Sequence, residues 1–299
     1  MDKELRLKLA VQKSGRLTDP SLDILSRCGL KLSRGKDQLM GFGENLPLDV
    51  LFVRDDDIPD LVQEDVCDLG LVGLNVIEER RLELEARGST ARFQTLRSLD
   101  FGRCRLALAV PEGFDYQGPQ SLNGKRIATT YPFILGRFLA EHSLNAEIVT
   151  LSGAVEIAPR LGRADLICDL VSSGSTLQAN HLREVLTILQ SHAVLIRTPV
   201  NLPSFKEEWI ERLLLRIDGV EQVKESKYIM LHAPRSALPR IRELLPGSEF
   251  PTIIPLEGSA DKVAVHAVCR ENVFWETLES LKGAGASALL VLPVEKMLS

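Results

Sequence analysis

The sequence predicts an α/β protein in three compact units, with two similar lobes followed by a smaller C-terminal domain. Short apolar strands alternate with helices over residues 5–86, and a similar order returns over residues 125–176. Strands that alternate with helices favour parallel sheets, so each series predicts one α/β lobe. The last quarter of the 299 residues has the order βαββαβ, which is typical of a ferredoxin-like domain.

The first lobe is predicted from apolar periodicity and turn signals. Its expected elements are a strand at 5–11, a loop at 12–16, a helix at 19–28, a strand at 49–53, a helix at 58–64, a strand at 66–72 and a helix at 76–86. Asp19 would cap the first helix before Pro20, and Gly29 would end that helix.

The second lobe is predicted to repeat this plan. Its expected strands are 125–129, 146–151 and 164–171, and its expected helices are 131–142 and 154–161. Residues 67–69 (Cys-Asp-Leu) align with residues 164–166 (Ala-Asp-Leu). Two crossings, 99–110 and 194–198, would join lobes that face each other across a cleft. A helix at 204–217 would rest on the first lobe.

The C-terminal domain completes the expected division. Its predicted elements are strands at 228–232, 252–256, 263–268 and 288–293, with helices at 236–245 and at 272–283, the latter capped by Asn272. The predicted boundaries are 1–98 plus 199–223 for the first lobe, 99–198 for the second lobe and 224–299 for the last domain.

Composition excludes several classes of protein. A net charge of −5 argues against a general nucleic-acid binder. No apolar run is long enough to span a membrane, and the charged start is unlike a secretory signal. The five cysteines and five histidines are scattered. We therefore expect buried thiols, at Cys67 and Cys168 among others, no zinc site, no nucleic-acid or membrane partner, and a cytoplasmic location.

The most informative loop follows the strand at 164–171, because ligands bind beyond the carboxyl ends of parallel strands. Its residues are Ser172, Ser173, Gly174, Ser175 and Thr176. Hydroxyls, backbone N–H groups and a helix start near Thr176 would bind an anion such as a phosphate monoester. A Ser/Thr-rich turn that caps the next helix is about equally favoured.

Two carboxylates are expected beside this loop. Asp169 lies near the end of the strand, and Glu156 lies one loop away. Such a pair suits sugar hydroxyls or a Mg²⁺ ion. The alternatives are a satisfied buried carboxylate for Asp169 and a first-turn helix acid for Glu156.

The opposite lobe presents cations at strand ends. Lys13, Arg16 and Arg54 would bind a pyrophosphate group, although each alone is typical of solvated surface charge. Residues 55–57 (Asp-Asp-Asp) are interpreted as helix caps rather than metal ligands. Gly73 and Asn75 would leave room for a nucleobase, and a tight helix–strand crossing explains them nearly as well.

Taken together, these segments resemble the ATP phosphoribosyltransferase family, the first enzyme of histidine biosynthesis, in its long form with a C-terminal regulatory domain. The resemblance covers nearly the whole chain and is carried by residues 9–17, 53–59, 68–73, 156–159, 169–177, 225–230 and 291–296. It implies a catalytic part like type II periplasmic binding proteins and an ACT-like C-terminal domain. The common phosphoribosyltransferase motif has two adjacent acids, whereas only Asp169 stands there in this sequence.

The resemblance also implies the reaction and the site. The family joins ATP to 5-phosphoribosyl-1-pyrophosphate (PRPP), depends on Mg²⁺, is inhibited by histidine and assembles as dimers and hexamers. The implied site residues are Lys13, Arg16, Arg54, Glu156 and Asp169 for catalysis, residues 172–176 for the PRPP phosphate, and Gly15, Gly73 and Asn75 for the nucleotide. No direct protein ligand to a metal is expected.

Two competing functions remain open at this stage. A bilobal α/β chain is also the plan of solute-binding proteins, and a catalytically inactive homologue would regulate a partner instead. The presence of Lys13, Arg16, Arg54 and the whole 172–176 loop favours an active enzyme.

Overall fold

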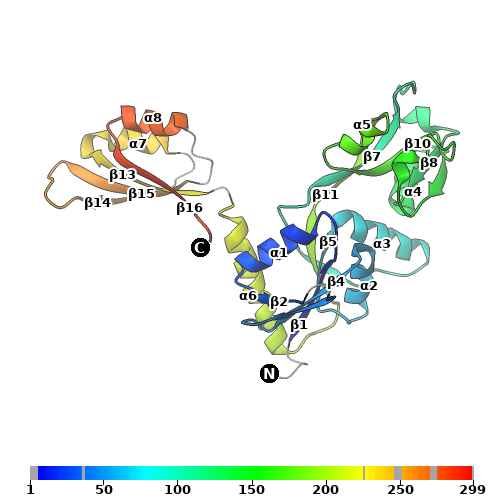
Figure 1. Cartoon of the computed structure of the whole chain (residues 1–299), viewed down its shortest axis with the longest axis horizontal. Coiled ribbons are helices and arrows are strands. Elements are labelled where there is room, and N and C mark those ends of the chain that lie inside the picture. Colours follow the sequence, from blue (N-terminus) through cyan, green and yellow to red (C-terminus); the bar gives the residue numbers. More distant parts are fainter. Residues whose placement is uncertain (1–5, 36–37, 225, 246–250, 270–274, 298–299) are drawn as a thin grey trace. The chain divides into compact units, whose positions relative to one another are not determined.

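The computed structural model describes residues 6–35, 38–224, 226–245, 251–269 and 275–297. It divides into two compact units, Met1–Trp209 and Ile210–Ser299. The first unit contains two sheets, and the second contains one sheet with helices packed on it (Figure 1).

The first sheet has parallel strands at its centre. Its strand order is β2-β3-β4-β1-β5-β12-β6. The strands are β1 (Leu7–Gln12), β2 (Leu32–Ser33), β3 (Met40–Gly43), β4 (Leu48–Val53), β5 (Leu69–Gly73), β6 (Gln94–Ser98) and β12 (Ala193–Arg197). Strand β1 pairs in parallel with β4 and β5, whereas β12 runs antiparallel to β5. Strands β2, β3 and β6 are not predicted from the sequence, because they are short or mostly exposed and show no clear apolar period.

The helices of the first lobe differ in detail from expectation. They are α1 (Thr18–Arg27), η2 (Asp55–Asp57), α2 (Ile58–Gln63) and α3 (Leu74–Ala86). Asp19 was predicted to cap α1, but it lies inside the first turn and Leu17 occupies the N-cap without a side-chain bond. Asp57 occupies the N-cap of α2, as predicted for the run 55–57, but these residues form a 3₁₀ turn and the expected side-chain capping bond is not formed.

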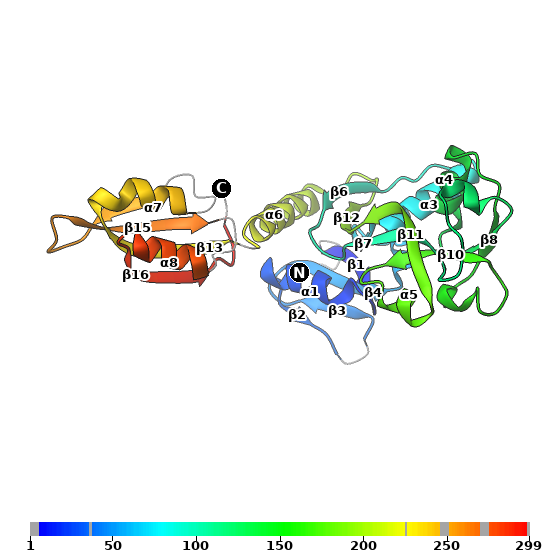
Figure 2. The same ribbon diagram turned by 90° about the horizontal axis from the view of Figure 1, so that it is seen from above.

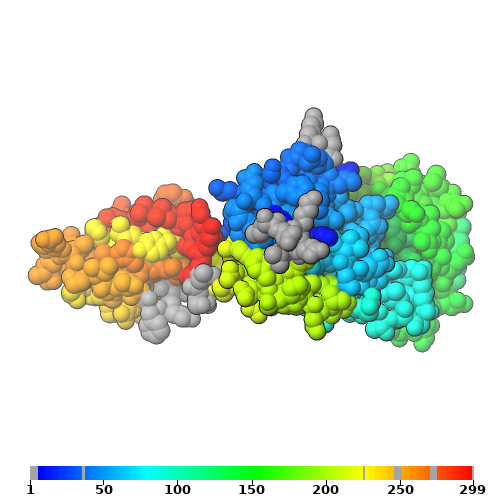
Figure 3. All heavy atoms as spheres, turned by 90° about the horizontal axis from the view of Figure 1, so that it is seen from below, coloured from blue at the N-terminus to red at the C-terminus, as the bar shows by residue number. Residues whose placement is uncertain are grey.

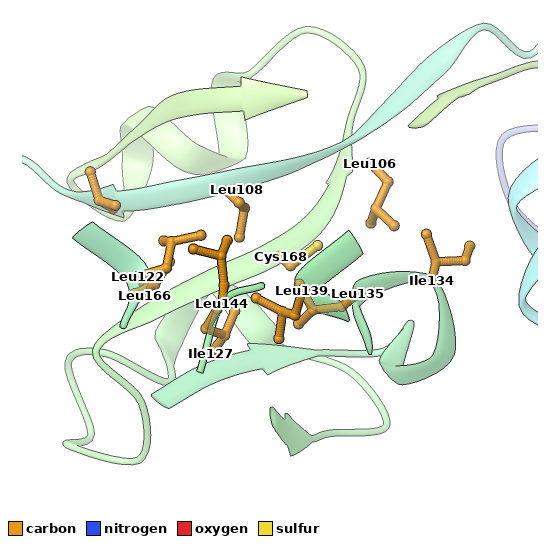
Figure 4. Packing of buried hydrophobic residues seen from close by; sticks show 11 residues of the cluster. Leu106, Leu108, Leu122, Ile127, Ile134, Leu135, Leu139, Leu144, Leu166 and Cys168 are labelled. Atoms are coloured by element: carbon orange, nitrogen blue, oxygen red, sulfur yellow. The ribbon is translucent and has the colours of Figure 1, made fainter. Parts of the chain in front are cut away.

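The second sheet has the order β11-β7-β10-β8-β9. Its strands are β7 (Cys104–Pro111), β8 (Arg126–Thr129), β9 (Glu147–Thr150), β10 (Leu166–Val171) and β11 (Leu182–Ser191), and its helical segments are η3 (Pro119–Leu122), α4 (Pro132–Glu141), η4 (Val155–Ile157) and α5 (Ser175–Ala179). Leucines of β7 and α4 meet Ile127 of β8 in a buried cluster (Figure 4). The helix predicted at 154–161 is wrong beyond the single turn η4.

The internal repeat is confirmed at the level of hydrogen bonds. Asp68, just before β5, exchanges two bonds with the backbone of Lys8 at the start of the neighbouring parallel strand. Asp165, just before β10, exchanges the same two bonds with Arg126 at the start of β8. In each lobe, an aspartate at the equivalent position therefore fixes the register of two parallel strands.

The two crossings between the lobes lie side by side. Leu99 N–H donates to Ala193 O at 2.9 Å, and Ala193 N–H donates to Phe101 O at 3.0 Å. Strand β12 pairs with β5 and β6, so residues 193–197 belong to the first sheet, whereas the sequence analysis assigned them to the second lobe. Helices α3 and α4 also contact each other across the lobes (Figure 1).

Helix α6 (Ser204–Glu221) begins in the first unit, as expected, and is longer than predicted. Lys206 in its first turn binds both oxygens of Asp68, at 2.8 and 2.9 Å. Because Asp68 also binds Lys8, the segment around residue 205 lies against N-terminal residues (yellow-green and blue in Figure 3).

The second unit confirms the βαββαβ prediction. Its elements are β13 (Lys227–Pro234), η5 (Arg235–Ala237), α7 (Leu238–Leu244), β14 (Thr252–Pro255), β15 (Lys262–Cys269), α8 (Trp275–Gly283) and β16 (Ser287–Pro293). The strand order β14-β15-β13-β16 is that of a ferredoxin-like sheet. Helices α7 and α8 cover one face of this sheet (Figures 1 and 2). The predicted cap Asn272 and the predicted strand residue Leu5 lie outside the described residues.

Two predictions from composition can be compared with the structure. All five cysteines are buried, which confirms the prediction for Cys67 and Cys168. Within the described ranges, no helix combines the length and the apolar character that crossing a membrane requires.

Candidate active site

The first half of the site lies at the carboxyl edge of the first sheet. Gln12 at the end of β1 stands opposite Val53 at the end of β4, and Lys13 N–H continues this ladder by donating to Val53 O at 2.7 Å. Lys13 and Arg54 therefore follow adjacent strand ends. Strand β5 ends at Gly73 beside them. The expected adjacency of these strand ends is confirmed.

The loop that carries Lys13 and Arg16 is wrapped around the side chain of Gln12. The Gln12 amide oxygen accepts a hydrogen bond from Leu17 N–H at 2.9 Å, and Gln12 O accepts one from the Thr18 hydroxyl at 3.0 Å. Gly15 has φ +138°, and a Cβ atom there would lie 2.6 Å from Gln12 Nε2. A side chain at position 15 would thus meet both backbone strain and a collision. Lys13 and Arg16 themselves are exposed.

Arg54 begins an acidic stretch. Its guanidinium lies 3.5 Å from the Asp56 carboxylate, and both side chains are largely exposed. Partial burial and the neighbouring Asp55 raise the pKa of Asp56, and Arg54 opposes that shift. The weak internal ion pair leaves Arg54 available to an anionic ligand.

The second half of the site is the loop after β10. Ser172, Ser173, Ser175 and Thr176 are exposed, while Val171 and Leu177 anchor the loop in the core. Gly174 has φ +82°, a conformation that glycine adopts at little cost. The hydroxyls of Ser173 and Ser175 lie 3.0 Å apart, and Gly174 is the N-cap of α5 without a side-chain bond. The Ser173 hydroxyl also accepts a hydrogen bond from Ser175 N–H, the first N–H of α5, at 3.4 Å. The phosphate-binding role and the helix-capping role of the loop therefore both stay predictions.

The two predicted carboxylates lie close enough to affect each other. Burial raises the pKa of Asp169 to about 6, the hydrogen bond from Leu170 N–H opposes this shift, and the charge of Glu156 adds to it. The Leu170 bond is 2.8 Å long. Asp169 is therefore a partly desolvated carboxylate beside the hydroxyl loop (residues 172–176). A carboxylate in such an environment is suited to bind the hydroxyl groups of a ligand.

Tyr131 of the second lobe contacts the first lobe through Asn75 and is influenced by charges on both lobes. Burial raises the pKa of the Tyr131 hydroxyl, the hydrogen bond to Asn75 lowers it, and the charges of Asp55, Asp169 and Asp56 raise it further. Asp55 and Asp56 belong to the first lobe and Asp169 to the second. The acidic edges of the two sheets therefore act on one hydroxyl.

Asn75 connects the lobes rather than facing open solvent. Its Nδ2 donates to the Tyr131 hydroxyl at 2.9 Å, and its Oδ1 accepts from the Ser191 hydroxyl at 2.7 Å. The residue is 2% exposed. These bonds favour a positioning role for Asn75 over direct contact with a nucleotide. One turn later, Glu79 accepts hydrogen bonds from the first-turn N–H groups of Phe133 and Ile134, each 2.8 Å long.

Three groups that support the site were missed from the sequence: Gln12, Glu79 and Arg105. Each acts through bonds to residues distant in sequence or to backbone atoms, and neither kind of contact leaves a local motif. Arg105 near the start of β7 belongs to no recognisable motif in the sequence, yet its Nη1 donates to Ser172 O at 3.2 Å.

No group of three or more His, Cys, Asp or Glu residues arranged to hold a metal ion occurs in the described part of the chain. Asp55, Asp56 and Asp169 are nevertheless oxygen donors of the type that Mg²⁺ prefers. Any of these carboxylates would act as one ligand of an ion whose other ligands are phosphate oxygens and water.

Comparison with known proteins identifies the family. The model of the ATP phosphoribosyltransferase (HisG) family matches residues 54–219, and the model of the HisG C-terminal domain matches residues 224–296. The ATP phosphoribosyl transferase (HisG:HisZ) complex from Thermotoga maritima contains a chain 27% identical over 71% of this chain and 98% of its own, with a TM-score of 0.57.

A second solved structure is similar at a lower score. The alkanesulfonate-binding protein SsuA from Xanthomonas axonopodis pv. citri, bound to MOPS, is 15% identical over 74% of this chain and 75% of its own, with a TM-score of 0.47. With its two α/β lobes and its C-terminal domain, the chain belongs to the ATP phosphoribosyltransferase family in its long form and is a transferase of histidine biosynthesis.

Proposed function

We propose that this protein transfers the 5-phosphoribosyl group of PRPP to N1 of ATP, releases pyrophosphate and forms phosphoribosyl-ATP. The observation that carries the proposal is the contact between the lobes at Asn75 and Tyr131, where Asn75 Nδ2 donates to the Tyr131 hydroxyl at 2.9 Å. Asn75 follows β5, beside the cationic edge of one lobe, and Tyr131 follows β8, the neighbour of the strand that leads into the hydroxyl loop of the other. A reaction that joins two phosphorylated substrates needs two such anion sites within reach of each other.

In this proposal the second lobe holds the ribose 5-phosphate. Ser172, Ser173, Ser175 and Thr176 offer exposed hydroxyls, and Gly174 allows the backbone to approach the phosphate closely. Asp169 and Glu156 accept hydrogen bonds from the ribose hydroxyls. Ribosyl transfer passes through a cationic state at C1, which two neighbouring carboxylates stabilise by charge.

The first lobe receives the departing pyrophosphate and the nucleotide. Lys13, Arg16 and Arg54 neutralise phosphate oxygens, and an arginine can bind two of them at once. Gly15 and Gly73 bring the backbone edge of the sheet close to the nucleotide, and Asn75 positions Tyr131. Mg²⁺, when bound, would neutralise phosphate charge beside Asp55, Asp56 and Asp169.

No general base is assigned. N1 of adenine in ATP carries no proton, so attack on C1 requires alignment rather than proton removal. Catalysis then depends on the positions of the two substrates and on the charges around the leaving group. A covalent intermediate with the protein is not needed.

Histidine inhibition and assembly belong to the same proposal. The ferredoxin-like second unit would bind histidine between subunits of a dimer or a hexamer, and its family match to the HisG C-terminal domain supports this assignment. A cytoplasmic location, predicted from cysteine usage, also remains part of the proposal.

One assay tests the proposed reaction. The protein is mixed with ATP, PRPP and Mg²⁺, and pyrophosphate release is followed with and without histidine. We expect release that needs all three components and falls when histidine is added. A protein that binds these ligands without releasing pyrophosphate is a binding protein or an inactive regulator, and the proposal is then wrong.

The Thr176→Val variant provides a sharper version of this assay. It removes one exposed hydroxyl while keeping the branched shape of the side chain. The variant should weaken the use of PRPP more than it lowers the free energy of unfolding. Equal losses of activity and stability would argue against the phosphate-binding role of the loop.

A further inference from the structure

The Arg105 side chain contacts the backbone, not a side chain, of the hydroxyl loop (residues 172–176). Its Nη1 donates to Ser172 O at 3.2 Å, and Arg105 stands directly opposite Val171 in the antiparallel pair of β7 and β10. Val171 is the last residue of β10 before the loop. Arg105 is thus attached to the first peptide of the hydroxyl loop.

The guanidinium is held in one orientation by Glu184. Arg105 Nε lies 2.6 Å from Glu184 Oε1, and Arg105 Nη2 lies 2.5 Å from Glu184 Oε2. The Thr187 hydroxyl adds a third bond to Glu184 Oε1 at 3.1 Å. A two-pronged pair of this kind fixes the plane of the guanidinium as well as its distance. Consistently, the paired arginine lowers the pKa of Glu184.

The orientation of one peptide follows from this contact. The peptide bond between Ser172 and Ser173 is planar, and its C=O and N–H groups point in opposite directions. When Arg105 binds Ser172 O, the N–H of Ser173 is directed away from Arg105. Because Glu184 already neutralises Arg105, the contact adds little net positive charge to the loop.

We propose that Arg105, held by Glu184, is a positioning residue that orients the Ser172–Ser173 peptide so that the Ser173 N–H faces the 5-phosphate of PRPP. This inference rests on the proposed function of the loop. Arg105 does not contact the phosphate itself. Its loss weakens the binding of PRPP and leaves the use of ATP nearly unchanged.

Two variants separate positioning from direct binding. Arg105→Gln removes the contact with Ser172 O, and Glu184→Gln frees Arg105 while making its surroundings more positive. If Arg105 is a positioning residue, both variants should raise the KM for PRPP about tenfold, which corresponds to the loss of one charge-assisted hydrogen bond. Direct binding predicts that Glu184→Gln leaves this KM unchanged or lowers it.

Arg126 provides a matched control in the same sheet. It also pairs with a carboxylate, at 3.0 Å from Asp165 Oδ1, and with a loop carbonyl, at 2.9 Å from Gly162 O. It lies at the amino edge, away from the hydroxyl loop. Arg126→Gln should lower thermal stability by an amount similar to Arg105→Gln and should leave both KM values within about twofold.

The experiment measures KM for PRPP, KM for ATP, kcat and the melting temperature for the full chain and the three variants. Calorimetric titration with PRPP gives its affinity independently of turnover. A tenfold weaker response to PRPP in both Arg105→Gln and Glu184→Gln, with KM for ATP unchanged, supports the inference. If Arg105→Gln does not fold, Glu184→Gln and the control decide between the two roles.

Other outcomes contradict the inference. If both variants bind PRPP with unchanged affinity, the Arg105–Glu184 pair has a purely structural role. If Glu184→Gln binds PRPP more tightly, Arg105 contacts the ligand directly. If the wild-type protein shows no turnover but binds PRPP, the proposed reaction fails while calorimetry still tests the role of Arg105. A wild-type protein that does not bind PRPP overturns both.

Discussion

At the scale of single residues, the site combines exposed cations with one desolvated acid. The side chains of Lys13, Arg16 and Arg54 are exposed, so a ligand binds them without a large desolvation penalty. Asp169 is different, because burial raises its pKa to about 6. An acid of this kind destabilises the fold when it is charged, which indicates that its position is selected for a reason other than stability.

Asp169→Asn should separate activity from stability. The native state binds the Asp169 proton more tightly than the unfolded state does, so its contribution to stability is present below about pH 4 and is lost as the pH rises through about 6. At pH 8 the variant should be more stable, by roughly 2 kcal/mol, and should use PRPP about a hundredfold less well.

Denaturant unfolding and the pH dependence of kcat/KM check this prediction. The wild-type profile should fall on the acid side near pH 6, and the variant should lack that fall. A variant that loses stability and activity together would give Asp169 a structural role instead.

Arg16→Ala tests the cationic loop. Arg16 is exposed, so its removal should leave the free energy of unfolding within about 0.5 kcal/mol while lowering turnover on the order of a hundredfold. The fractional inhibition by histidine should be unchanged. Steady-state kinetics measure both quantities, with Arg87→Ala, just after α3, as an exposed control. Unchanged kinetics would exclude Arg16 from the site.

At the scale of elements, the conformation of the loops after the strands determines which side chains are exposed at the edge of each sheet. The loop after β1 takes its shape from Gln12, whose amide binds Leu17 N–H on the far side of the turn. The sequence predicted this loop and its cations. It did not predict the role of Gln12, because the contact depends on how the chain turns back.

Gly15→Ala should disrupt this loop more than the fold. A Cβ atom at position 15 would collide with the Gln12 amide, in addition to the strain of a positive φ. Gly88→Ala, at φ +72° with nothing within 4 Å, carries the strain alone. Gly88→Ala should lose about 1 kcal/mol of stability and Gly15→Ala about 2 kcal/mol, and only Gly15→Ala should reduce turnover, by tenfold or more. Equal turnover in the two variants would contradict the role of the loop.

At the scale of the whole molecule, a few buried polar contacts hold distant elements in register. Asp68 binds Lys8 at the start of β1 and Lys206 at the start of α6. Asn75 and Glu79 link α3 to α4 and so connect the two lobes of the first unit. These residues lie far apart in the sequence, and their pairing exists only in the folded chain.

Lys206→Met should lower the free energy of unfolding by about 3 kcal/mol, because it leaves the charge of Asp68 buried and unpaired. The side chains of Lys206 and Asp68 are only 12% and 9% exposed. Arg240→Met, which breaks the exposed pair with Glu243, should cost less than about 0.5 kcal/mol. Thermal and denaturant unfolding measure the difference, and a similar cost in both variants would show that burial does not matter here.

The sequence by itself determined the fold class, the repeat of two α/β lobes, the ferredoxin-like order of the last domain and the loops that carry charged residues. These features follow from local periodicity and from glycine and proline positions. The helix predicted at 154–161 was wrong beyond η4, because the apolar spacing of these residues is compatible with a buried turn as well as with a helix.

Only the tertiary structure decided which side chains act together. It relates Asp55 and Asp56 to Asp169 through Tyr131, assigns Asn75 to the contact between lobes, and joins Arg105 to the phosphate loop. It also places β12 in the first sheet. The physical reason is that electrostatic and hydrogen-bond interactions depend on distance in space, whereas the periodicity of a sequence reports only the local path of the chain.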